Sequence, residues 1–107
     1  MFCKSDCNCY REVLPGISMK TLVHGERTLM TEFRLKKGSI LPSHEHFHEQ
    51  TGYLVSVRMV LSIGNATYEV TSGDSWNIPG GVSHYAEVLE DSVAIEVFSP
   101  RRDEYIQ

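Results

Sequence analysis

The sequence has no long uninterrupted apolar segment and no block of basic residues. A membrane-spanning helix needs about 20 consecutive apolar residues, so no segment is predicted to cross a bilayer. The 14 acidic residues outnumber the 10 basic ones, giving a net charge of −4, which argues against nucleic acid as a partner. Met1–Tyr10 also lacks the apolar stretch of a signal peptide. These absences predict a soluble, cytoplasmic protein.

Helical periodicity is absent as well, because no segment combines a 3.6-residue apolar repeat with helix caps. Short alternating segments between turn residues predict β-strands instead. The segment Tyr53–Ile63 is too long for one ordinary strand, and a bend is expected near Ser56–Arg58. Every second residue of this segment is apolar, so these side chains are predicted to share one face. Many short strands with regular turns predict a single all-β domain, an antiparallel sandwich or barrel.

Cysteine is scarce, and its three copies, Cys3, Cys7 and Cys9, all lie near the start of the chain. Their odd number and C-x3-C-x-C spacing match no common zinc or iron–sulfur framework. We expect residues 1–10 to form a flexible tail with reduced thiols, ahead of one domain at 11–107. A redox-active or metal-capturing tail is the alternative, and it would need a fourth ligand from elsewhere.

Histidine, in contrast, is concentrated in Gly38–Gln50, which contains His44, His46 and His48 and ends two positions after the last of them. In an extended backbone these three side chains and that of Gln50 share one face. A row of imidazoles is costly to bury, and a metal ion is the commonest partner that satisfies several together. Hydrogen-bonded core histidines without metal are the alternative.

A second block, Gly73–His84, reads GDSWNIPGGVSH and supplies a further histidine. Together the two blocks resemble the paired motifs of the cupins, G-x5-H-x-H-x3/4-E-x6-G and G-x5-P-x-G-x2-H-x3-N. In the first motif Gln50 stands where a glutamate is usual. The matching residues are Gly38, His44 and His46 in the first motif, and Gly73, Pro79, Gly81 and His84 in the second.

Two further positions depart from the cupin pattern, since Val57 and Val88 replace a glycine and an asparagine. Gln50 would be a neutral ligand, so no protein ligand would offset the positive charge of the metal, which would then act on bound water or substrate. The resemblance implies a cupin jelly roll (an antiparallel β-barrel or double-stranded β-helix) that forms a homodimer. It also implies one divalent ion, zinc, nickel, manganese or iron, bound by His44, His46, Gln50 and His84.

The last predicted strand, 92–99, places an acid among apolar side chains, because Glu96 shares its face with Ala94 and Phe98. A carboxylate that points into the barrel beside a metal could act as a general acid or base. A solvated edge strand or a structural ion pair is the alternative. Arg102 follows where the strand ends and would clamp a substrate carboxylate, unless it is only a surface charge of a polar tail, 101–107.

Within the cupins, the chain is similar to small bacterial proteins that linearise unsaturated uronates released from pectin and alginate. That subgroup has an H-x-H-x-H-x-Q motif, here running from His44 to Gln50, and an acid-x-F-[ST]-P-x-R motif, here Glu96–Arg102. Its acid is an aspartate, whereas this chain has the longer glutamate. The resemblance implies a metal-dependent enzyme for a small anionic sugar acid. Its implied catalytic residues are Glu96 and Arg102, and its implied substrate contacts are Phe98, His48 and Tyr53.

Two other functions fit the same residues. One is a protein that binds a metal and a small anion without turnover, which the change of acid to Glu96 would suit. The other is a cupin dioxygenase, which needs a redox-active metal with open coordination positions. His48 is also open to three roles: a hydrogen-bonding partner behind the ligands, a substrate contact, or a replacement ligand.

Overall fold

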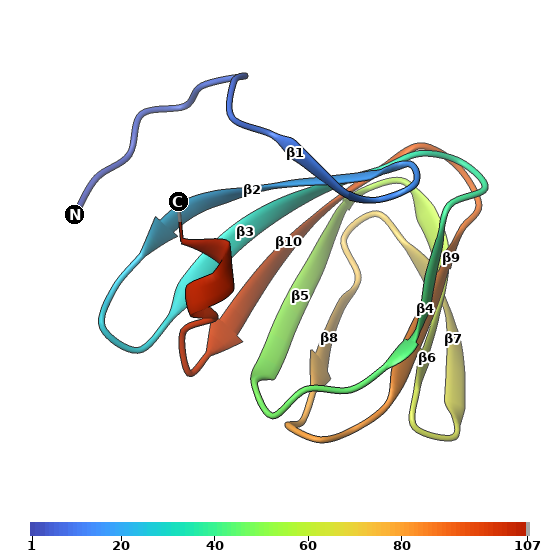
Figure 1. Cartoon of the computed structure of the whole chain (residues 1–107). Helices are drawn as coiled ribbons and strands as arrows, with labels where there is room; N and C mark the ends of the chain where they lie inside the picture. Colours follow the sequence, from blue (N-terminus) through green and yellow to red (C-terminus); the bar gives the residue numbers. More distant parts are fainter. Residues whose placement is uncertain (107) are drawn as a thin grey trace.

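The computed structural model describes residues 1–106, which fold mainly into β-strands (Figure 1). A short 3-10 helix, η1 (Asp103–Tyr105), follows the last strand. In the part of the chain described, no helix is long and apolar enough to cross a membrane. The strands are β1 (Arg11–Leu14), β2 (Ile17–His24), β3 (Leu29–Leu35), β4 (Ile40–His44), β5 (Glu49–Ser56), β6 (Arg58–Ile63), β7 (Ala66–Thr71), β8 (Ser75–Ile78), β9 (His84–Val88) and β10 (Ser92–Ser99).

Two antiparallel sheets face each other and confirm the predicted all-β architecture. One has the strand order β1-β2-β3-β10-β5-β8, and the other has the order β4-β9-β6-β7. No strand pair joins the two sheets within residues 1–106, so they form a sandwich that hydrogen bonds do not close into a barrel. The core lies between the inner faces of both sheets. Its main cluster consists of Leu54, Met59, Leu61, Val70, Ala86 and Ala94.

The N-terminal segment lies against the six-stranded sheet without forming a strand before Arg11. Lys20 donates a hydrogen bond from Nζ to the carbonyl oxygen of Asp6 (2.7 Å), and the Tyr10 hydroxyl donates to Glu32 (2.8 Å). The three cysteines are exposed and none forms a disulfide. The flexibility of the tail stays a prediction.

The predicted bend in the long apolar segment lies at Val57, where the chain passes from one sheet to the other. The single apolar face predicted there is wrong, because the alternation changes phase at this residue. Leu54 of β5 is fully buried, whereas Tyr53 is 48% exposed on the outer face. Before the bend the even-numbered residues, such as Leu54, are buried, whereas after it the odd-numbered residues, such as Met59, are buried. A one-residue change of phase moves every later side chain to the other face.

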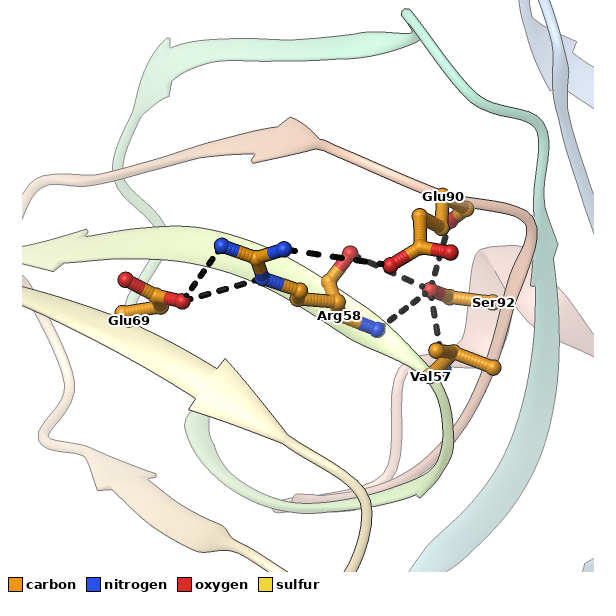
Figure 2. Close-up of polar contacts among 5 residues, drawn as sticks. All are labelled: Val57, Arg58, Glu69, Glu90 and Ser92. Carbon is orange, nitrogen blue, oxygen red and sulfur yellow. Dashed lines mark hydrogen bonds and ion pairs between the residues drawn. The ribbon is translucent and has the colours of Figure 1, made fainter.

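Ser92 organises this bend by hydrogen bonding to both sides of it (Figure 2). Its buried hydroxyl accepts the backbone N–H groups of Val57 and Arg58, each at 3.1 Å, and lies 2.8 Å from the carbonyl oxygen of Glu90. The Arg58 guanidinium pairs with Glu69 at 2.8 Å on the surface. The serine therefore satisfies backbone groups that leave the regular strand ladder at the sheet change.

We expect Ser92→Ala to lower the free energy of unfolding by about 1–3 kcal/mol, because two backbone donors lose their acceptor. Ser75→Ala, at an exposed strand position, is the matched control and should change it by less than about 0.5 kcal/mol. Urea unfolding followed by circular dichroism measures both. Equal stability of the two variants would show that Ser92 does not hold the bend.

Candidate metal centre and adjoining acid

Three of the four predicted metal ligands converge at one end of the sandwich. His44 ends β4 and His84 begins β9, and the two residues are direct partners in the antiparallel register. Their ring centroids lie 4.1 Å apart, and the ring of His46 lies 5.1 Å from that of His84. One ring nitrogen from each of the three lies within 4.8 Å of the others. Strand pairing thus brings together two motifs that are distant in the sequence.

The loops that carry these histidines are fastened to each other through glycine. The backbone N–H of Gly81 donates to the carbonyl oxygen of His46 at 2.8 Å. At Gly80 a Cβ atom would collide with the carbonyl oxygen of Phe47, and Gly81 has a φ of +79°. Only glycine suits both the close approach and the left-handed backbone, which gives a physical reason for the glycines of the second motif.

Hydrogen bonds to the backbone fix the tautomer of all three clustered imidazoles. Nδ1 of His44 lies 2.9 Å from the Pro42 carbonyl oxygen, and Nδ1 of His84 lies 3.1 Å from that of Val82. Nδ1 of His46 lies 3.0 Å from the carbonyl oxygen of His48. A carbonyl oxygen can only accept, so each Nδ1 carries the proton. Each Nε2 is therefore left with a free lone pair, as in histidines that bind metal.

Burial favours the neutral form of two of the three clustered histidines. It lowers the pKa of His84 to about 4, and it also lowers the pKa of His46, with the positive charge of Arg102 adding to the effect. The buried Nε2 of His84 has no hydrogen-bond partner among residues 1–106. Neutral imidazoles with unused lone pairs at one point fit a divalent cation, for which imidazole is a common ligand.

Gln50, the fourth predicted ligand, lies between the cluster and the acid. Its Oε1 is 3.1 Å from Nε2 of His46, and its Nε2 donates a hydrogen bond to Oε2 of Glu96. Because Nδ1 of His46 holds the proton, two lone pairs face each other across the 3.1 Å contact. A cation beside both atoms would relieve that repulsion, so the amide orientation fits Gln50 as an oxygen ligand.

His48 is not part of this three-histidine group, although its ring lies 5.5 Å from that of His46. It is buried with its ring 4.1 Å from that of Phe47, and its Nδ1 has no partner in the described part of the chain. Its backbone carbonyl instead accepts from His46. The predicted row of four side chains is interrupted here because residues 45–48 form a loop rather than a strand. His48 thus supports a clustered histidine through its backbone.

Glu96 lies on the inner face of β10, as the predicted strand pattern required, and is 5% exposed. Burial raises the pKa of its carboxyl to about 7, while the neighbouring Gln50 amide and Trp76 indole lower it. A Cβ at Gly52 would collide with both Trp76 and this carboxylate. The missing side chain of Gly52 thus leaves the space that the acid occupies.

A cavity of about 380 Å³ joins the acid to the metal cluster. Phe98 and Arg102 line it, whereas Tyr53 does not, because β5 turns that side chain to the outer face. Trp76 and Tyr105 line it too, and neither was identified from the sequence. Polar residues around the cavity are His44, His84, Gln50, Glu96, Arg102 and Tyr105.

The C-terminal segment, which was predicted as a polar tail, is partly buried within residues 101–106. Tyr105 of η1 packs against the inner face of the six-stranded sheet, with its ring 5.6 Å from that of Phe98 and 6.4 Å from that of Phe33. Arg102 is consequently only 15% exposed. The two aromatic contacts of Tyr105 thus hold this segment against the sheet despite its polar composition.

The raised pKa of Glu96 gives a pH-dependent stability that a single variant tests. A carboxyl whose pKa rises on folding from its ordinary 4.5 to about 7 stabilises the fold below pH 4.5, and this contribution is lost as the pH rises through 7. In metal-free protein, Glu96→Gln should therefore raise the melting temperature clearly at pH 8 and little at pH 5. Glu87→Gln, on an exposed position of β9, is the control. A gain for Glu96→Gln that is equal at both pH values would contradict this assignment.

Comparison with known proteins places this geometry in a family. A model of the Cupin_2 family, a cupin domain, matches residues 31–99. The structure of KdgF from Halomonas sp. is 30% identical with a TM-score of 0.93, covering 99% of this chain and 100% of that one. The pectin degradation protein KdgF of Dickeya dadantii (strain 3937) is 26% identical, covering 91% of this chain and 90% of that protein.

An RmlC-like cupin from Shewanella frigidimarina shares the fold at 23% identity, with a TM-score of 0.92 over 98% of this chain and 95% of that one. The family match spans more than half of the chain and includes both histidine motifs. The chain therefore belongs to the cupin family and, within it, to the group that resembles KdgF.

Proposed function

We propose that this cupin is a metal-dependent isomerase that opens the ring of a small unsaturated uronate and converts the resulting enol to a ketone. The observation that carries the proposal is the buried Glu96 carboxyl, which is hydrogen-bonded to Gln50 and shares a cavity with two of the three clustered histidines, His44 and His84. Similarity to a pectin degradation protein supports the choice of substrate, because pectin is a polymer of uronates.

The metal site would be formed by His44, His46 and His84, with Oε1 of Gln50 beside it. A divalent ion there supplies Lewis acidity toward a substrate oxygen. The three Nδ1 hydrogen bonds hold the imidazoles in place before any ion binds.

Glu96 is suited to move protons in both halves of such a reaction. Ring opening removes the proton of the anomeric hydroxyl, breaks the bond between the anomeric carbon and the ring oxygen, and adds a proton to that oxygen, leaving an aldehyde and an enol. Ketonisation then adds a proton to the alkene carbon and removes one from the enol oxygen. Substrate and product have the same formula, so no oxidant is needed. A carboxyl with a pKa near 7 exchanges protons efficiently at neutral pH.

Arg102 would hold the carboxylate of the uronate. It lines the cavity, and its buried Nε has no partner among the residues described. A planar guanidinium is well matched to a carboxylate. The cavity volume of about 380 Å³ lies in the range of small-molecule sites, and Phe98 provides an apolar wall.

The longer acid of this chain has room within the site. Compared with an aspartate, Glu96 carries its carboxylate one methylene farther from the backbone, a change that can shift proton-transfer geometry by about 1 Å. The space above Gly52 receives this carboxylate, and the amide of Gln50 orients it. The substitution is therefore compatible with turnover.

We expect the metal-loaded protein to convert the unsaturated monouronate that a pectate lyase releases, with loss of the alkene proton signal in proton NMR. Glu96→Gln should retain the metal and the fold but lower kcat/KM by about 10²–10⁴-fold, the contribution of a general acid or base. Glu87→Gln is the charge-matched control and should match wild type.

Unchanged turnover in Glu96→Gln would remove Glu96 from the mechanism. A uronate that raises the melting temperature of the wild-type protein but is recovered unchanged would instead establish a binding protein without this activity.

A further inference from the structure

The Arg102 guanidinium is contacted by one residue of β10, Phe98, and by two residues of the C-terminal turn η1, Glu104 and Tyr105. The guanidinium carbon lies 4.3 Å from the centroid of the Tyr105 ring and 5.0 Å from that of Phe98. On its outer side, one terminal nitrogen donates to the carboxylate of Glu104 at 3.0 Å. Two aromatic rings thus restrict the group while an acid of its own chain occupies one end.

Tyr105 is itself fixed by contacts that do not involve Arg102. Its backbone carbonyl accepts a hydrogen bond from the hydroxyl of Thr21 on β2, and its ring packs edge to face on Phe33 of β3. Arg11 donates to the carbonyl oxygen of Glu104 at 3.2 Å. These partners all belong to strands of the six-stranded sheet. The sheet therefore holds the Tyr105 ring in a fixed position against the arginine.

The donor groups of the Arg102 guanidinium differ in how they are satisfied. Glu104 is 58% exposed, and an ion pair with such a solvated carboxylate contributes little stability, so it is easily exchanged. Nε of Arg102, in contrast, is buried without any partner in residues 1–106. A buried unpaired donor is costly, and an anion entering from the cavity would satisfy it.

We propose that the C-terminal turn is a carboxylate receptor that its own chain keeps occupied: Tyr105 and Phe98 hold the Arg102 guanidinium in place, and Glu104 is the internal carboxylate that a substrate carboxylate displaces. This inference rests on the proposed function for the identity of the ligand. It makes Tyr105 a positioning residue and makes Glu104 a determinant of affinity, so substitutions at the two positions have opposite effects on anion binding.

Binding of a non-reacting sugar acid tests this directly. Trp76 is the only tryptophan of the chain and lines the cavity, so its fluorescence reports occupancy. Metal-loaded protein is titrated with D-galacturonate and, separately, with D-galactose, which lacks the carboxylate. Wild type should bind galacturonate more tightly than galactose. This readout needs no turnover, so a protein that fails to isomerise uronates still gives a result.

Tyr105→Leu should weaken galacturonate binding about tenfold, through loss of the cation–π contact, without a matching loss for galactose. Tyr105→Phe keeps the ring and should restore wild-type affinity. Glu104→Gln removes the competing charge but keeps an acceptor, and should tighten galacturonate binding by roughly threefold. Glu87→Gln controls for a change in net charge and should have no effect.

The proposal is wrong if wild type fails to prefer galacturonate over galactose. It is equally wrong if Tyr105→Leu loses both sugars alike, which would mark the ring as merely structural, or if Glu104→Gln leaves galacturonate affinity unchanged or weaker. Tyr105→Phe tests the role of the ring even if Tyr105→Leu fails to fold.

Discussion

The site depends on the hydrogen bonds that the three clustered imidazoles donate from Nδ1 to backbone carbonyl oxygens. These bonds orient each ring and leave each Nε2 unprotonated, while one ring nitrogen from each residue lies within 4.8 Å of the others. The Nε2 of His84 is buried with no hydrogen-bond partner in the described residues. A divalent cation would satisfy it where the two histidine motifs meet.

The acid is coupled to this cluster through the pairing of β5 with β10. Gln50 is paired with Phe98 and Gly52 with Glu96, so the amide and the carboxyl are diagonal neighbours on one inner face. The amide turns its oxygen to His46 and its nitrogen to Glu96. The acid and the amide therefore lie on paired strands of one sheet, two of the clustered histidines lie on paired strands of the other, and Arg102 lines the cavity beside them.

The meeting of the two histidine motifs was predictable from their spacing, even though the alternating row is interrupted by a loop at residues 45–48. The inward-facing acid was predictable from the period-two alternation of the last strand. The outward turn of Tyr53 was not, because the segment around it is apolar on both faces and only the sheet change at Val57 decides the phase. Tyr105 was missed because a tail of charged residues gives no periodic signal, and its position depends on contacts with Phe33 and Phe98. Long-range packing of single aromatic residues leaves no local pattern.

The most direct test of this account is the metal content of protein purified without chelator or metal-affinity tag, compared with that of His46→Ala and His48→Ala. We expect about one divalent ion per chain in wild type and in His48→Ala, because the ring nitrogens of His48 do not belong to the three-histidine group. We expect the ion to be lost in His46→Ala, which removes an imidazole ligand. A folded wild-type protein that takes up no divalent ion, or one that loses it only in His48→Ala, would contradict the assignment of the metal centre.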